Sequence, residues 1–196
     1  KALEARLAAV LKTDAPRAAK DFVCRQLSYI GSAESVPVLA ALLPDKDLSH
    51  MARVALERIP GAEAVKAMRE ALPKVEGQVK VGVINSLAVR RDAESVSALA
   101  GLLEGSDQQV AAAAAAALGA IGTPEAAQAL EGFQKKAPEK LRPAAADACL
   151  ACADRLLAAG KKAEALAIYK SLTGPEQPKH VRLAATRGLL AAAGKK

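Results

Sequence analysis

The residue types best suited to chemistry in this sequence are two cysteines, Cys149 and Cys152, in the segment CLAC. A C-x-x-C pair can be redox-active at a helix N-terminus, or it can supply half of a zinc site. Zinc needs four ligands, yet the sequence has no second C-x-x-C pair and no histidine directly after Cys152. Within an alanine-rich helix, this spacing favours two small side chains that fill the core.

The remaining residues of catalytic type are few. The histidines, His50 and His180, each stand at the start of an expected helix, where solvated side chains are common. With Cys24 the cysteines number three, an odd set that makes no disulfide framework and indicates no compartment. No nucleophile elbow, P-loop or glycine-rich dinucleotide motif occurs. We therefore expect no catalytic residue, no metal and no cofactor, and predict that the protein is not an enzyme.

The composition predicts an all-α protein. Apolar residues make up 52% of the 196 positions. Alanine is the commonest of them, and it has the highest helix propensity. No segment approaches the roughly 18 to 20 apolar residues that span a bilayer, and the charged helix expected at 2–12 is unlike a signal peptide. We expect a soluble chain without membrane insertion, and the sequence leaves its localisation open.

A period of about thirty residues divides the chain. Segments with similar sequence contain the aligned residues Leu27, Leu56, Leu87 and Leu118. The glutamates that follow are separated by 29, 31, 31 and 39 residues: Glu34, Glu63, Glu94, Glu125 and Glu164. Apolar residues recur at helical spacing on both sides of each glutamate, so each unit is expected to be a helix pair. The predicted pairs form a single array over 1–196, with approximate bounds 1–30, 31–60, 61–90, 91–121, 122–159 and 160–196.

Turn-forming clusters place the ends of the individual helices. The expected helices cover 2–12, 16–30, 33–43, 48–59, 62–72, 78–90, 93–104, 108–121, 124–136, 139–159, 162–172 and 179–193. The helix at 108–121 contains seven consecutive alanines, from Ala111 to Ala117. In a helical array such a run lets neighbouring backbones approach closely while leucines fill the remaining space, so we interpret it as structural.

The segments VAAAAAAALGAIGTPEAAQAL and HVRLAATRGLL resemble the HEAT-like repeats named after phycobilisome lyases. The pattern of that repeat family runs Val-Arg, an alanine cluster, Leu-Gly, a β-branched residue and glycine, and then a Pro-Glu-Ala helix. The resemblance covers nearly the whole chain and implies a right-handed α-solenoid (α-α superhelix) of about six antiparallel helix pairs. Residues 148–175 also resemble one tetratricopeptide unit, with Gly160, Ala165, Tyr169 and Pro175 near the family's small, aromatic and proline positions.

In the resembled family the second helix of each pair lines the concave surface. The resemblance therefore implies candidate partner-binding residues on the second helices: Lys20, Arg25, Arg53, Glu57, Lys80, Asn85, Arg182 and Arg187. Asn85, a polar residue among apolar neighbours, could instead bond the backbone of a neighbouring helix, which is the interpretation we favour over ligand contact.

The net charge of +7 suggests a second surface. Basic residues follow the second helices at equivalent turns and should form a basic edge: Arg90, Arg91, Lys161, Lys162, Lys195 and Lys196. Equivalent turns of a solenoid lie along one edge, where cations also stabilise helix C-termini. This edge could attract an acidic protein or a polyanion.

These features favour a non-catalytic scaffold for an unknown protein partner. The alternative is nucleic-acid or polyanion binding through the basic C-terminal edge. Nucleic acid is disfavoured because Phe22, Phe133 and Tyr169 fall at apolar helical positions and offer no aromatic platform. We expect a monomer. Because the chain begins with Lys1 and both ends fall at repeat boundaries, we also expect an accessory module or fragment of a larger protein.

Overall fold

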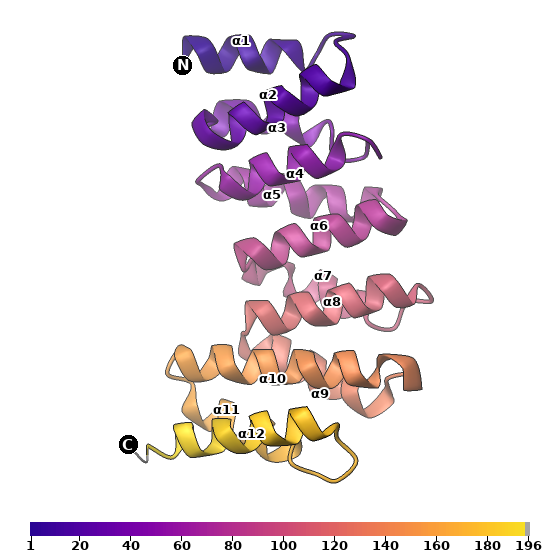
Figure 1. Cartoon of the computed structure of the whole chain (residues 1–196), viewed down its shortest axis with the longest axis vertical. Helices are drawn as coiled ribbons and strands as arrows, with labels where there is room; N and C mark the ends of the chain where they lie inside the picture. Colours follow the sequence, from indigo (N-terminus) through magenta and orange to yellow (C-terminus); the bar gives the residue numbers. More distant parts are fainter. Residues whose placement is uncertain (195–196) are drawn as a thin grey trace. The chain divides into compact units, whose positions relative to one another are not determined.

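The structure is a computed structural model that describes residues 1–194, and it is built of helices in this range (Figure 1). It divides into two compact units at the junction between the third and fourth helix pairs. Unit 1 comprises Lys1–Arg90, and unit 2 begins at Arg91.

Unit 1 contains three helix pairs in two layers. Its α-helices are α1 (Ala2–Val10), α2 (Arg17–Ile30), α3 (Val36–Ala40), α4 (Ser49–Arg58), α5 (Ala62–Ala71) and α6 (Gly77–Arg90). The second helices α2, α4 and α6 pack side by side, and α3 packs beside α5 behind them (Figure 1). We call the layer of α2, α4 and α6 the second-helix layer of unit 1.

Unit 2 repeats this arrangement. Its α-helices are α7 (Val96–Leu102), α8 (Gln108–Ile121), α9 (Pro124–Lys136), α10 (Arg142–Ala158), α11 (Lys162–Ser171) and α12 (Lys179–Ala192). The second helices α8, α10 and α12 again pack side by side, and α9 packs against α7 and α11 (Figure 1). The all-α prediction is confirmed, and the helices lie close to the expected positions.

Three α-helices begin later than expected, because a 3-10 turn precedes each of them. The helix expected from residue 33 begins as a 3-10 turn, Ala33–Ser35, and becomes α-helical only at Val36. The helices expected from residues 93 and 139 likewise begin in 3-10 form, as Ala93–Ser95 before α7 and as Glu139–Leu141 before α10. In α3 and α10 a proline, Pro37 or Pro143, falls in the first α-helical turn, where its missing N–H leaves no bond unmade, whereas α7 has no proline at this position.

The aligned leucines form the centre of each unit. Leu27, Leu56, Leu87 and Leu118 are all 0% exposed. Because each occupies the same position in its second helix, the repeat register deduced from the sequence holds at these four positions. The core around them is aliphatic, and alanine contributes many of its members.

The alanine run of α8 lies against α10. Ala114 and Ala115 are fully buried. At Gly119, in the next turn, an added Cβ would lie 2.6 Å from the backbone oxygen of Ala148 in α10. The two backbones therefore approach as closely as the sequence interpretation required, and only a residue without a side chain fits at Gly119.

The first pair of unit 1 is joined to the second by a buried carboxylate. Glu4 is 5% exposed, and its Oε1 accepts hydrogen bonds from Ser35 Oγ (2.7 Å), Ser32 Oγ (2.8 Å) and Ser32 N (2.7 Å). The hydrogen bond from Ser35 is the main reason that the pKa of Glu4 is lowered, against an opposing effect of burial. Glu4 thus caps the start of the 3-10 turn that leads into α3.

Candidate interaction surface

Two of the sequence-predicted partner-binding residues hold unit 1 together. Arg53 Nη1 in α4 donates hydrogen bonds to Gly82 O (2.9 Å) and Ser86 Oγ (3.1 Å) in α6. Ser86 Oγ in turn donates to Glu57 Oε1 (2.6 Å). An added Cβ at Gly82 would lie 2.5 Å from Arg53 Cζ, so the absence of a side chain there makes room for the guanidinium. Arg53 and Glu57, both half-buried, therefore connect α4 to α6.

Arg90, predicted to lie on the basic edge, also has a structural role. Its Nη1 donates to Ile59 O (2.6 Å) and Glu57 O (3.1 Å), and its Nη2 donates to Gly61 O (2.8 Å). These carbonyl groups lie at and just beyond the C-terminus of α4, where backbone acceptors lack partners within the helix. Arg90 therefore caps α4 from α6.

The rest of the predicted basic edge is exposed where it is described. Arg91, Lys161 and Lys162 are exposed residues of unit 2, whereas Lys195 and Lys196 lie outside the described residues. Lys161 also contributes to lowering the pKa of the exposed Glu125, after larger effects from the Glu125 backbone and Thr123. The predicted edge thus retains three described side chains in unit 2.

The other partner-binding candidates divide by exposure. The exposed ones are Arg25, Asn85 and Arg187, and the half-buried ones are Lys20, Lys80 and Arg182. The expectation that Asn85 bonds a neighbouring helix is wrong. Asn85 stands two residues before the buried Leu87, a position about 160° away around a helix, so its side chain faces solvent.

The same geometry defines an outward surface on the second-helix layer of unit 1. Residues two positions before and after each core leucine must point away from the core. The positions before Leu27, Leu56 and Leu87 are Arg25, Val54 and Asn85, and the positions after them are Tyr29, Arg58 and Val89. Together with Phe22, one further turn along α2, these seven residues are called the second-helix face of unit 1.

This face exposes large apolar side chains. Phe22, Tyr29 and Val89 are 57%, 69% and 64% exposed. The guanidinium of Arg58 on α4 lies 5.3 Å from the centre of the Tyr29 ring on α2, in a cation–π arrangement. Neighbouring helices therefore combine aromatic and basic groups on one surface.

Sequence reasoning missed most of this surface. The expectation that Phe22 occupies an apolar, inward position is wrong, because the adjacent Val23 and Cys24 take the buried positions of that turn. Tyr29, Val54, Arg58 and Val89 were not among the candidates. Their fixed offset of two residues from the aligned leucines was the available signal.

The cysteines are packed as the sequence interpretation predicted. Cys149 and Cys152 are 1% and 0% exposed, and Cys24 is 0% exposed. Burial raises the pKa of Cys149 to about 12, and that of Cys152 and of Cys24 to about 11, so the thiols stay protonated near neutral pH. They fill the core as inert side chains.

The histidines are exposed. His180 Nε2 lies 3.0 Å from Asp147 Oδ1, and His50 Nδ1 lies 3.4 Å from Arg53 Nη2. Within residues 1–194, no group of three or more His, Cys, Asp or Glu side chains is arranged to hold a metal ion. In the described structure, the two histidines make surface contacts with Arg53 and Asp147.

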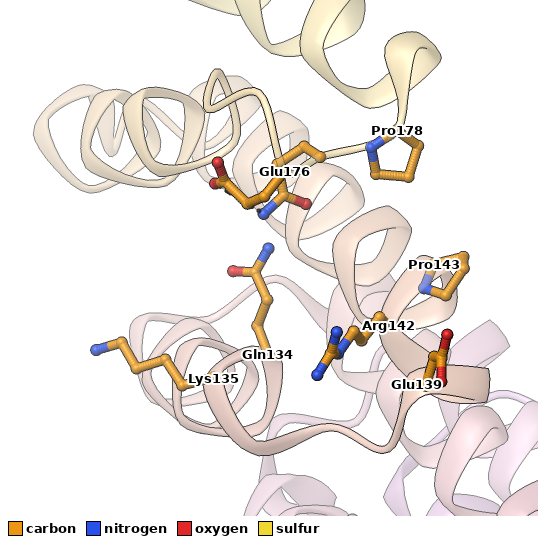
Figure 2. A pocket seen from close by; sticks show the side chains of 8 residues that line it. Gln134, Lys135, Glu139, Arg142, Pro143, Glu176 and Pro178 are labelled. Atoms are coloured by element: carbon orange, nitrogen blue, oxygen red, sulfur yellow. Dashed lines mark hydrogen bonds between the residues drawn. The ribbon is translucent and has the colours of Figure 1, made fainter.

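Unit 2 contains a pocket of about 360 Å³ between the turns that precede α10 and α12 (Figure 2). Its lining residues are Gln134, Lys135, Glu139, Arg142, Pro143, Glu176, Gln177 and Pro178. Figure 2 shows Gln134 and Arg142 extending toward the open space from α9 and from the start of α10. The lining has two basic and two acidic side chains, so their charges balance.

Comparisons with known proteins agree with this helical architecture. Residues 74–151 match the family model of HEAT repeats. The matched segment includes α8 and most of α10, whose backbones lie close together at Gly119 and Ala148. No curated protein matches the sequence. In the described part of the chain, no helix is long and apolar enough to cross a membrane.

Two solved structures share the fold. An engineered protein, known from its crystal structure, is 21% identical with a TM-score of 0.54, and the match covers 96% of each chain. A designed armadillo repeat protein is 18% identical with a TM-score of 0.52, and the match covers 95% of this chain and 98% of that one. At this identity the likeness concerns the fold alone, which is an all-α repeat solenoid.

Proposed function

We propose that the protein is a non-catalytic protein-interaction scaffold whose partner docks on the second-helix face of unit 1. The observation that carries the proposal is the exposure of Phe22 and Tyr29 on one side of α2. The other two aromatic residues, Phe133 and Tyr169, are 7% and 1% exposed. Aromatic and arginine side chains are enriched at the centres of protein interfaces. An aliphatic core that leaves two of its four aromatic residues in solvent therefore fits an interaction surface.

The repeat architecture supports the same proposal. Stacked helix pairs present extended surfaces made of equivalent positions on successive helices. The second-helix face has this form, because its residues keep the same offset from Leu27, Leu56 and Leu87. We further propose that the repeats are of the phycobilisome-lyase type, as the Leu118-Gly119 motif after the alanine run suggests, and that residues 148–175 form a tetratricopeptide-like unit.

The test is selection from a displayed library of random twelve-residue peptides. The full chain should enrich a family of binding peptides, and the triple variant Phe22→Ser/Tyr29→Ser/Val89→Ser should bind them at least tenfold more weakly. Truncating interface hot spots commonly costs 2 kcal/mol or more, which corresponds to more than tenfold in affinity. All three side chains are exposed, so these substitutions leave the core intact.

A matched control is available in unit 2. Leu183 and Leu190 on α12 are also exposed, at 53% and 58%. The variant Leu183→Ser/Leu190→Ser should bind the selected peptides as the wild type does. The proposal is wrong if no peptide family is enriched, or if the triple variant retains binding while the control variant loses it.

A further inference from the structure

Charge is distributed unevenly between the two helix layers of unit 1. The second helices α2, α4 and α6 carry seven Lys and Arg residues and two carboxylates. The first helices α1, α3 and α5 carry three of each sign. The net positive charge of these helices therefore lies in the second-helix layer, because the charges of the first helices cancel.

The two carboxylates of that layer do little to neutralise its surface. Asp21 is half-buried, with one side-chain oxygen inaccessible to solvent and the other 3.8 Å from Arg17. Glu57 is half-buried and accepts the hydrogen bond from Ser86. In contrast, the basic groups of Arg25 and Arg58 are exposed. Every exposed ionised side chain on α2, α4 and α6 is basic.

We infer that the partner presents an acidic segment with interspersed apolar side chains to the second-helix face of unit 1. The inference rests on the proposed function and adds the chemistry of the partner. Arg25 and Arg58 lie on neighbouring helices and supply the contacts for carboxylates. Phe22, Val54 and Val89 supply apolar contacts between and beside them. Complementary charge of this kind sets specificity and speeds association.

The arrangement of the aromatic residues favours a protein segment over single-stranded nucleic acid. Nucleic acid that lies on aromatic platforms stacks successive bases on exposed ring faces. Phe22 and Tyr29 are seven residues apart on one helix, a separation of roughly 10 Å along its axis. One face of the Tyr29 ring is already covered by Arg58. The surface therefore lacks a continuous stacking path.

The test compares two labelled twelve-residue peptides in which leucine and phenylalanine alternate either with glutamate or with lysine. Fluorescence anisotropy with the full chain at 50 mM NaCl should show at least tenfold tighter binding of the glutamate peptide. Raising NaCl to 300 mM should weaken that binding at least threefold, because salt screens exposed charges. The variant Arg25→Glu/Arg58→Glu should reverse the preference and bind the lysine peptide more tightly.

The control variant, Arg6→Glu/Lys74→Glu, makes the same change in net charge. Both residues are exposed and lie outside the second helices, so the preference for the glutamate peptide should persist. Circular dichroism checks that both variants keep the helix content of the wild type.

The inference is overturned if neither peptide binds, if both bind equally, or if the preference survives the reversal variant. It is also overturned, in favour of nucleic acid, if a twenty-nucleotide oligo(dT) binds the wild type more tightly than the glutamate peptide does and no longer binds the reversal variant. Failure of this inference can be distinguished from failure of the proposed function. If the selected library peptides are neutral or basic, and the Phe22/Tyr29/Val89 variant no longer binds them, the interaction surface is supported and the acidic partner is refuted.

Discussion

Gly119→Ala should destabilise unit 2, although alanine is the better helix former. An added Cβ would lie 2.6 Å from Ala148 O, 3.1 Å from Ala148 Cα and 3.2 Å from Ala148 C. These are backbone atoms of α10, which cannot turn aside as a flexible side chain would. Overpacking of this kind costs about 1 to 3 kcal/mol, and distances this short on a backbone favour the upper part of that range. The propensity gain of about 1 kcal/mol offsets only part of it, leaving a net loss of about 1 to 2 kcal/mol.

Two other helical glycines provide the control. Gly101 in α7 and Gly132 in α9 are exposed, and an added Cβ at either would meet nothing within 4 Å. Alanine at these positions should stabilise unit 2 by about 0.5 to 1 kcal/mol. Urea unfolding followed by circular dichroism at 222 nm measures all three variants. A Gly119→Ala midpoint equal to or above that of the wild type would refute the close approach of α8 and α10.

The remaining predictions concern the backbone at Arg91 and the carboxylate of Glu4. Arg91 is the one described non-glycine residue with positive φ (50°), a backbone conformation that glycine adopts more readily. Arg91→Gly should therefore stabilise the fold by about 0.5 to 1 kcal/mol and raise the urea midpoint. An unchanged or lower midpoint would contradict this prediction. The pKa of Glu4 is lowered in the folded state, so its stabilising effect is complete above the ordinary value of 4.5 and is lost as pH falls through the folded value. Between pH 5 and pH 3 the urea midpoint of the wild type should therefore fall more than that of Glu4→Gln, and equal falls would count against the buried cap.

The helical organisation could be predicted from the sequence because it depends on local patterns. The leucine register around Leu27 and Leu56, and the alanine run before Gly119, each reflect the packing of one helix against its neighbours. The positions of the α-helix starts were less accurate, because three expected helices begin with a short 3-10 turn, and apolar spacing does not distinguish such a turn from the α-helix that follows it.

The roles of individual polar residues could not be predicted in the same way. Arg53 and Arg90 are of a residue type that is common on binding surfaces. In the structure each instead donates a hydrogen bond to a group about thirty residues away in the same chain. Those contacts depend on the axial register of one helix relative to the next, and the periodic pattern does not specify that register. Phe22 shows the converse case, because its apolar character suggested a core position that Val23 and Cys24 already occupy.

The central claim is that a protein segment docks on the second-helix face of unit 1. It is tested most directly by titrating the ¹⁵N-labelled chain with the glutamate peptide and following the backbone amide resonances. The largest shifts should fall on the residues of α2, α4 and α6 that flank the core leucines, in particular Arg25, Tyr29, Arg58 and Val89. Shifts concentrated on α1, α3 and α5, or confined to unit 2, would contradict the claim.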